Sequence, residues 1–414
     1  MKNNNTNIIK DLKKLLNDYM TKASLREFIK KLGQDNSSYS NEESDFSEID
    51  KSQVEYEVPK GIDHRVIVDK LITHCETELT EEKFYNLLLD LSLLMLNCGE
   101  LAFSLEIAEN LLGKLNSDNK NVSLLAETNL MISRIYWSQA IWDDCSYYAS
   151  KAMELFASIS NELGIAKCEN MFGTLYAEKG EIEKAQQHLE KALKHLNGVD
   201  DPSSRAMILT NLGIIYTIKG EFEKAVLNYK TSVETFNNLN DAHRLSRVYH
   251  NIGMLYTKME KYDEALDEFN KCISHSLDND NLSTCAVAYV GKSFIYTKLK
   301  NTALADAYTD KAMEIAYKIN DTLSIADIYK IKGMIQSEMD NFELSEEFFE
   351  NSIRLNKDLE SKFNTAESSV ELGKLLQKTE REEEAQPYIN SVVDYYKEIK
   401  AEDVQLIWLE NKIK

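Results

Sequence analysis

Residues that could support catalysis or metal binding are few and scattered in this sequence. The seven histidines are dispersed, and none lies in a His-Glu-x-x-His helix motif. His188 and His195 stand seven residues apart and share a helix face, where a solvated surface pair is favoured over a metal site. The sequence also contains no glycine-rich nucleotide loop and no nucleophile motif. We therefore predict a protein that is not an enzyme and uses no cofactor and no metal.

The six cysteines are dispersed too, and no two of them form a Cys-x-x-Cys pair. We interpret them as reduced thiols that act as small hydrophobic side chains. They are Cys75, Cys98, Cys145, Cys168, Cys272 and Cys285.

The composition favours a large helical protein and argues against two classes of partner. Apolar residues make up 43% of the 414 residues, and the 14 Gly and 3 Pro are too few for a turn-rich β fold. The formal net charge of −21 repels phosphate backbones and anionic lipid, so neither nucleic acid nor a membrane is an expected partner. No run of 18 apolar residues occurs, and the first residues lack the apolar core of a signal peptide, so a cytoplasmic location is expected.

A pattern with a period of 40 residues organises the chain from about residue 126. Around Gly213 the sequence indicates the end of one helix, a turn at Lys219-Gly220 and the start of a second helix. Steps of 40 from Gly213 always reach Gly or Ser, and an aliphatic residue always follows two positions later. Five of the seven repeats carry Tyr three positions after the site. The Gly/Ser sites are Ser133, Gly173, Gly213, Gly253, Ser293, Gly333 and Gly373.

The second helix of each repeat carries small residues at the same period. Two helices packed antiparallel at roughly 8–10 Å need small residues where their axes come closest. We therefore expect Gly213 to face Ala225 and Ser232. One hairpin cannot bury its own apolar faces, so the repeats must stack side by side. The first small site comprises Cys145, Ala185, Ala225, Ala265, Ala305, Ser345 and Ala385, and the second comprises Ala152, Ala192, Ser232, Cys272, Ala312, Ser352 and Val392.

Taken together, the Gly/Ser, Tyr and small sites resemble the tetratricopeptide repeat family over roughly residues 82–405. The resemblance implies an all-α protein, a right-handed α-solenoid of helical hairpins with an N-terminal helical extension. A unit of 40 residues is longer than the commonest form of the family. In the family, this longer type is found in motor light chains, polarity scaffolds and bacterial peptide-pheromone receptors.

The remaining segments suggest the following organisation. We predict a basic N-terminal helical segment (1–32), an acidic flexible linker (33–60), a helical region with a degenerate first repeat (61–125), seven repeats (126–405) and a C-terminal capping helix (401–414).

The resemblance also implies where a partner would bind, because the first helices of such hairpins line the concave face. Asn at the positions of Asn211 and Asn251 often clamps the backbone of a bound peptide in this family. Cations and apolar side chains beside them suit an extended or helical segment with acidic residues. The same residues could instead only keep a wet inner face soluble. The groove residues so indicated are Arg134, Lys167, Asn170, Met171, Thr174, Met207, Asn211, Ile214, Arg247, His250, Asn251, Met254, Val287, Gly291 and Phe294.

Three functions compete at this point. The first is a non-enzymatic scaffold that holds a protein or peptide segment in the concave groove. The second is a cytoplasmic peptide-sensing regulator that resembles the bacterial pheromone receptors, with the N-terminal helices as effector module. The third is a phosphatase-like effector, for which no matching catalytic residue can be carried over.

Overall fold

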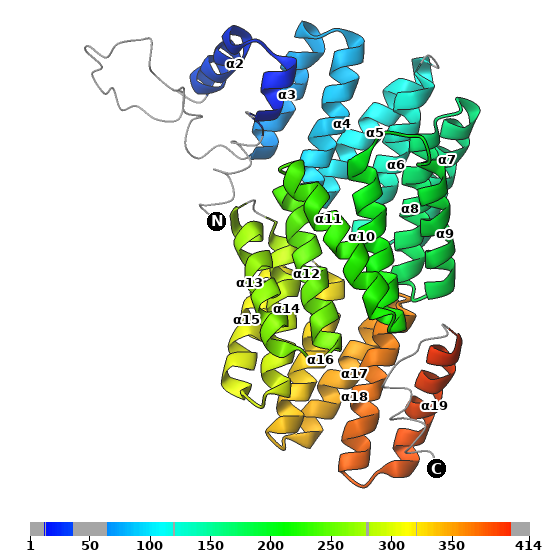
Figure 1. The fold of residues 1–414 in the computed structure, drawn as a ribbon. Coiled ribbons are helices and arrows are strands. Elements are labelled where there is room, and N and C mark those ends of the chain that lie inside the picture. The colour runs from blue at the N-terminus through cyan, green and yellow to red at the C-terminus, as the bar shows by residue number, and fades with distance from the viewer. Residues whose placement is uncertain are drawn as a thin grey trace, which may run out of the picture. The chain divides into compact units, whose positions relative to one another are not determined.

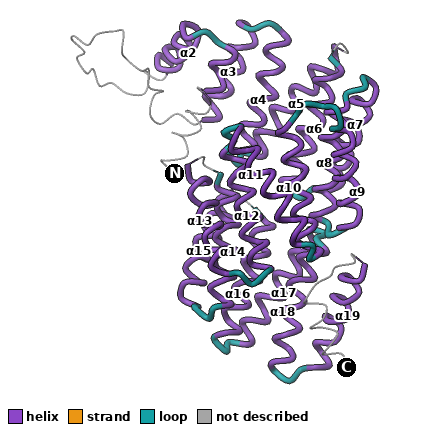
Figure 2. The backbone as a smooth tube through the Cα atoms, viewed as in Figure 1, coloured by secondary structure: helices purple, strands orange, loops and turns teal. Residues whose placement is uncertain are grey.

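The computed structural model describes residues 12, 14–35, 64–118, 121–278, 281–319 and 321–398 (Figure 1). In these ranges the chain forms helices α2 to α19 and no strand (Figure 2). The chain divides into two compact units, 1–135 and 136–414. The division falls inside α6, and each unit is described by itself below.

The N-terminal unit is a set of helices around one apolar core. Its helices are α2 (Lys22–Asp35), α3 (His64–Glu78), α4 (Glu81–Asn97), α5 (Leu101–Asp118) and most of α6 (Val122–Ser138). Helix α2 continues through Gly33 to Asp35, so the first three residues of the predicted linker are helical. The rest of that linker, residues 36–60, and the predicted capping helix, residues 401–414, lie outside the described residues.

Polar contacts between helices add to the apolar core of the N-terminal unit. Tyr19 Oη donates to Asp90 Oδ2 over 2.5 Å. Ser104 Oγ donates to the carbonyl oxygen of Ser92 over 2.7 Å, and Ser92 Oγ donates back to that of Ser104 over 2.9 Å. This reciprocal pair fixes the close approach of α4 and α5, as the Gly/Ser and small sites do in the later hairpins.

The C-terminal unit is a stack of antiparallel hairpins (Figure 1). Each hairpin joins an even-numbered helix to the odd-numbered helix that follows it. The helices are α7 (Trp142–Ser158), α8 (Glu162–Glu178), α9 (Ile182–His195), α10 (Pro202–Lys219), α11 (Phe222–Asn238), α12 (Ala242–Lys258), α13 (Tyr262–Asp278), α14 (Leu282–Lys298), α15 (Thr302–Ile319), α16 (Thr322–Glu338), α17 (Phe342–Asp358), α18 (Lys362–Lys378) and α19 (Glu382–Glu398).

The starts of six first helices, α6, α8, α10, α12, α14 and α16, are capped at the period of the repeat. The side chain of Asp201 accepts a hydrogen bond from the backbone N–H of Ser204 over 2.8 Å, and Asp241 accepts one from Arg244 over 2.9 Å. Such caps satisfy a donor that has no partner within the helix. The positions that accept in this way are Asn121, Asn161, Asp201, Asp241, Asn281 and Asp321.

Each first helix ends in a residue with left-handed backbone geometry, which favours glycine. Only two of these turns in the C-terminal unit use glycine, Gly180 (φ 72°) and Gly220 (φ 80°). The other turns hold Ala140, Glu260, Lys300, Asp340 and Glu380 at φ between 57° and 60°. Most of the hairpin turns are therefore kept in this conformation by the packing of the helices on either side.

Replacing Glu260 by glycine should stabilise the protein, because Glu260 is exposed and has φ 58°. We expect the free energy of unfolding to rise by about 0.5–1 kcal/mol. Glycine removes the strain of the left-handed geometry, and part of that gain is offset because glycine loses more conformational entropy on folding. Urea unfolding measures it. The matched control is Glu264→Gly inside α13, which should lose about 1 kcal/mol. Two variants with the same sign would contradict the explanation.

The Gly sites of the first helices make room for a large side chain of the second helix. A Cβ atom at Gly213 would lie 2.5 Å from Tyr229, and one at Gly253 would lie 2.7 Å from Phe269. Where the site is Ser293 the facing residue is the smaller Thr309, and their hydroxyl groups are hydrogen-bonded. The expected small-to-small contact is therefore only part of the packing. Ser232 does meet the first helix, since its Oγ donates to the carbonyl oxygen of Ala206 over 2.9 Å.

Candidate functional site

The first helices of the hairpins form the inner layer of the C-terminal unit. Each even-numbered helix from α8 to α18 contacts the even-numbered helices next to it. The main contacts of the odd-numbered helices are with the helices before and after them in sequence. Neighbours in a curved stack come closest at the smaller radius, so the even-numbered helices line the concave side. This arrangement places most of the predicted groove residues on one continuous inner face.

Two of the predicted amides meet directly. Asn211 Nδ2 on α10 donates to Asn170 Oδ1 on α8 over 2.8 Å, and Asn170 is buried. Asn251 lies half-buried at the equivalent position of α12. The Asn170–Asn211 bond leaves one oxygen and one N–H of Asn211 for a ligand, which is what a backbone clamp requires.

Apolar side chains continue the inner face beside the amides. Met254 is 44% exposed, although it is large and apolar. Ile214 and Phe294 are half-buried, and Lys298 Nζ lies 5.2 Å from the centre of the Phe294 ring. These three residues could contact the apolar part of a ligand.

Other predicted groove residues take part in structure. Thr174 Oγ1 donates to the Met171 carbonyl oxygen over 2.8 Å within its own helix. The ring of His250 meets Phe269 edge-on at 5.8 Å, inside the α12–α13 hairpin, where its buried Nε2 atom has no hydrogen-bond partner among the described residues. A Cβ atom at Gly291 would lie 2.3 Å from the same Phe269 ring, so Gly291 is a packing residue. Burial and the nearby Arg247 lower the pKa of His250 to about 4, so it is neutral at pH 7.

Half-buried side chains occupy two further predicted positions. Lys167 lies on α8, in the C-terminal unit, whereas Arg134 belongs to the N-terminal unit. Arg134 therefore cannot be assigned to the same surface as the other groove residues.

Arg247 faces a carboxylate that the sequence did not indicate. Burial and the nearby Arg244 lower the pKa of Arg247. Glu178, at the end of α8, is close enough to raise it in part. Burial, together with Asp321 and Asp327 of the α16 region, raises the pKa of Glu178 to about 7, against the influence of Arg247. Glu178 is therefore partly protonated at neutral pH.

Stability should fall as the pH rises towards 7, because Glu178 must then ionise in the folded protein. Its pKa rises from 4.5 to about 7 on folding, so between these values the folded state binds more protons than the unfolded state. We expect a loss on the order of 2 kcal/mol across the window. Chemical unfolding of Glu178→Gln at pH 5, 6 and 7.5 should show this slope removed, while Glu154→Gln, at an exposed position of α7, should keep it. An unchanged slope in Glu178→Gln would contradict this assignment.

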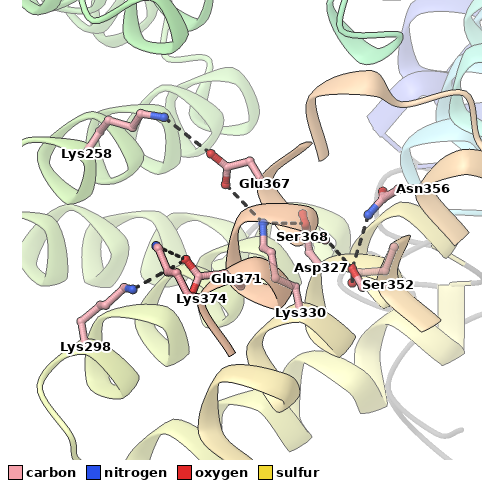
Figure 3. A network of polar contacts seen from close by, with 11 residues as sticks. Lys258, Lys298, Asp327, Lys330, Ser352, Asn356, Glu367, Ser368, Glu371 and Lys374 are labelled. Carbon is pink, nitrogen blue, oxygen red and sulfur yellow. Dashed lines mark hydrogen bonds and ion pairs between the residues drawn. The ribbon is translucent and has the colours of Figure 1, made fainter. Parts of the chain in front are cut away.

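A polar cluster joins α12, α14, α16 and α18 (Figure 3). Glu367 of α18 bridges Lys258 of α12, over 3.6 Å, and Lys330 of α16, over 3.4 Å. Lys330 also pairs with Asp327 over 3.3 Å, and only 9% of its surface is exposed. One turn further along α18, Glu371 contacts Lys374 at 2.7 Å and Lys298 of α14 at 4.0 Å.

The charges of this cluster stabilise one another. Burial alone would favour the neutral form of Glu367, but Lys258, Lys330 and Lys374 outweigh it and lower the pKa of Glu367 to about 2. The pKa of Glu371 is lowered against burial by Lys374 and Lys298. Burial would lower the pKa of Lys330, yet Asp327 and Glu367 raise it. Glu367, Glu371 and Lys330 are therefore charged at neutral pH.

The 40-residue period of the sequence indicates these acids. Steps of 40 from Arg247 lead to Val287, Asp327 and Glu367, and steps of 40 from Asn251 end at Glu371. The predicted groove residues end at Phe294, in the fifth of the seven repeats. What the period could not show is that the acids of the last repeats pair with lysines of α12 and α14.

The C-terminal unit also closes on itself. Trp142 Nε1 donates to the Leu359 carbonyl oxygen over 2.5 Å, and Tyr395 Oη donates to the Gly180 carbonyl oxygen over 2.9 Å. The backbone N–H of Lys362 donates to the Lys179 carbonyl oxygen over 3.2 Å. We call this contact the seam; its residues are Trp142, Lys179, Gly180, Leu359, Glu360, Lys362 and Tyr395. It joins the early hairpins of the unit to the last two.

The two histidines of α9 differ from the expected solvated pair. His188 Nδ1 lies 2.5 Å from Glu169 Oε2, and His195 Nδ1 lies 2.7 Å from Glu162 Oε2. Both acids belong to α8, so the pairs connect the two helices of one hairpin. Within the described ranges, no three His, Cys, Asp or Glu side chains gather in a way that could hold a metal ion.

Comparison with known proteins agrees with this architecture. Tetratricopeptide repeat models match residues 204–276, 170–194 and 326–359. No curated protein matches the sequence. No helix in the described part of the chain has the length and apolar character needed to cross a membrane.

Several solved structures share the fold at low sequence identity. The Rap conjugation gene regulator of plasmid pLS20 in complex with the Phr* peptide is 15% identical, with a TM-score of 0.57 over 69% of this chain and 77% of that one. A Rap protein complexed with Competence and Sporulation Factor is 13% identical, with a TM-score of 0.56 over 80% and 96%. Aspartyl phosphate phosphatase F from Bacillus subtilis is 15% identical, with a TM-score of 0.51 over 83% and 88%. The predicted solenoid of tetratricopeptide-like hairpins is confirmed.

Proposed function

We propose that this chain, whose repeats match tetratricopeptide repeat models, is a non-enzymatic scaffold that binds a peptide or protein segment along its inner face. The observation that carries the proposal is the row formed by the Asn170–Asn211 pair, Asn251 and the exposed Met254 on adjoining first helices. Amides spaced by one repeat can pair with the backbone of an extended chain, and the apolar side chains beside them can contact its side groups. The two Rap structures that share the fold are complexes with Competence and Sporulation Factor and with the Phr* peptide, which supports a ligand of this kind.

Replacing Asn211 and Asn251 together by alanine should abolish ligand capture, because both amides of the clamp are lost. Selection from a displayed library of random peptides measures it: the natural protein should enrich a family of sequences, and the double variant should enrich none. Helicity and melting should stay nearly unchanged, since neither side chain is fully buried.

The matched control is Asn237→Ala with Asn238→Ala, which removes two exposed amides from the outer helix α11. Enrichment should survive in this variant. If the Asn211/Asn251 variant enriches the same peptides as the natural protein, the binding site does not lie at these amides.

A second candidate is a peptide-sensing regulator, with the N-terminal helices as the effector module. The similarity of the fold to the Rap conjugation gene regulator favours it. Small-angle scattering with an enriched peptide separates the two functions, because a sensor should become more compact on binding whereas a passive scaffold keeps its pitch. A phosphatase activity, suggested by the name of the third structure, has no candidate catalytic residue in this sequence.

A further inference from the structure

Two sets of contacts of different character hold the C-terminal unit in its closed form. The seam is made largely of hydrogen bonds to backbone carbonyl oxygens, from Trp142, Lys362 and Tyr395. The second set is the ion cluster of Figure 3, in which Lys258, Lys298 and Lys330 surround Glu367 and Glu371. We call these five residues the clasp. Hydrogen bonds to carbonyl groups respond little to salt, whereas ion pairs weaken as they are screened.

The Lys258–Glu367 pair of the clasp spans more of the stack than the ion pairs between neighbouring repeats do. Arg381–Glu346 and Lys378–Asp340 join neighbouring hairpins. Lys258–Glu367 joins α12 to α18 and bypasses both α14 and α16. A contact between helices that are three repeats apart constrains the curvature of the whole segment, because small rotations at each hairpin interface add up along the stack.

The clasp residues also lie on the surface that a ligand would use. Glu367 occupies the position of Arg247 in its repeat, and Glu371 occupies that of Asn251. In the closed form their carboxylates reach across to α12 and α14. The carboxylates of Glu367 and Glu371 are therefore engaged by the protein's own lysines, whereas Asn170, Asn211 and Asn251 lie on α8, α10 and α12.

We propose that Glu367 and Glu371 form an electrostatic clasp that sets the width of the inner groove and confines a ligand to the α8–α12 part of it. This inference deepens the proposed function, since the groove that the clasp narrows is the surface assigned to the ligand. The side chains of Lys258, Glu367 and Glu371 are 17–24% exposed, so the pairs are sheltered from moderate salt. Salt near 1 M, where the screening length is roughly 3 Å, weakens them. Neutralising the two acids removes them at any salt concentration.

The test measures the width of the groove without any ligand. Spin labels at Glu260→Cys, beside Lys258, and at Lys362→Cys, at the start of α18, report the separation of α12 and α18 by pulsed electron paramagnetic resonance. Cys98→Ser serves as the background, because Cys98 is only partly buried whereas the other five cysteines are buried. The labelled protein with Glu367 and Glu371 intact, called the charged protein below, should give one narrow distance distribution. Glu367→Gln with Glu371→Gln should lengthen the distance by more than the width of that distribution.

The matched control is Glu346→Gln, which breaks the Arg381 pair between adjacent hairpins and should leave the distance unchanged. If the double glutamine variant does not fold, the charged protein in 1 M salt should show the same lengthening relative to low salt. A distance that changes neither with the substitutions nor with salt would overturn the clasp.

A second measurement separates this inference from the proposed function. A displayed library that mixes short and long peptides is selected against both proteins. The charged protein should enrich short peptides, and the double glutamine variant should enrich longer ones as well. If neither protein enriches any peptide, the proposed function fails while the distance measurement still decides the clasp. If both enrich peptides of the same length, the clasp does not confine the ligand.

Discussion

Gly213→Leu should destabilise the protein more than any other change at the repeat positions. A Cβ atom at Gly213 would lie 2.5–2.9 Å from three atoms of the Tyr229 ring, which is 1% exposed and cannot move outward. Overpacking of this kind costs roughly 1–3 kcal/mol and more where the neighbours cannot adjust, so we expect about 3 kcal/mol or above. Urea unfolding followed by circular dichroism measures the loss.

Gly113→Leu is the matched control for this substitution. Gly113 also lies inside a helix, α5, but a Cβ atom there would meet nothing within 4 Å. Leucine is the better helix former, so this variant should be neutral or slightly more stable. Gly213→Ser with Tyr229→Thr copies the natural Ser293–Thr309 pair and should recover part of the stability lost in Gly213→Leu. Normal melting of Gly213→Leu would show that the contact between the two helices lies elsewhere.

Lys330→Met should produce the second largest effect, because it removes the cation between Asp327 and Glu367. Breaking a buried ion pair costs about 3–5 kcal/mol when one charge is left without a partner. Glu367 keeps Lys258, and Asp327 is about one-third exposed, so we expect a smaller loss of about 2–3 kcal/mol. The free energy of unfolding at pH 7, from urea titration, measures it.

The same variant should show a characteristic dependence on pH. Lys330 lowers the pKa of Glu367 in the folded protein. An acid with a lowered pKa stabilises the folded state at neutral pH, and this stability is lost as the pH falls below about 4.5. The difference between Lys330→Met and the natural protein should therefore shrink towards pH 3. Lys332→Met, on the same helix, breaks only the pair with exposed Asp310 and should cost less than about 1 kcal/mol at any pH. Equal losses for the two lysines would contradict the role of the cluster.

The hairpins and their order could be predicted from the sequence because the contacts that form them lie within one repeat or between adjacent repeats. Gly213 and Tyr229 lie in the two helices of one repeat, and the caps at Asp201 and Asp241 act within a single helical turn. Interactions of such short range recur with the repeat, so a period of 40 residues records them. The inner position of Asn170, Asn211 and Asn251 follows from the same regularity.

The tertiary structure alone decided which inner residues remain available to a ligand. His250 occupies a groove repeat position, yet its ring is buried in its own hairpin against Phe269. Glu367 occupies the equivalent of the Arg247 position, yet its carboxylate is held by Lys258 and Lys330. The position of a residue in the repeat fixes where its backbone lies. The direction and partner of a long side chain depend on which residues of other repeats lie close to it.

The seam and the clasp are contacts that the repeat pattern of the sequence could not predict. Trp142 and Leu359 are 217 residues apart, and Tyr395 and Gly180 are 215 apart, so neither contact recurs with the repeat. They form because a small rotation at each hairpin interface accumulates until the last hairpins return to the early ones. The sequence by itself determined that this protein is a stack of hairpins with a polar inner face. The accumulated rotation, a property of all the interfaces together, decided that the stack closes and that Glu367 and Glu371 pair with lysines of earlier repeats.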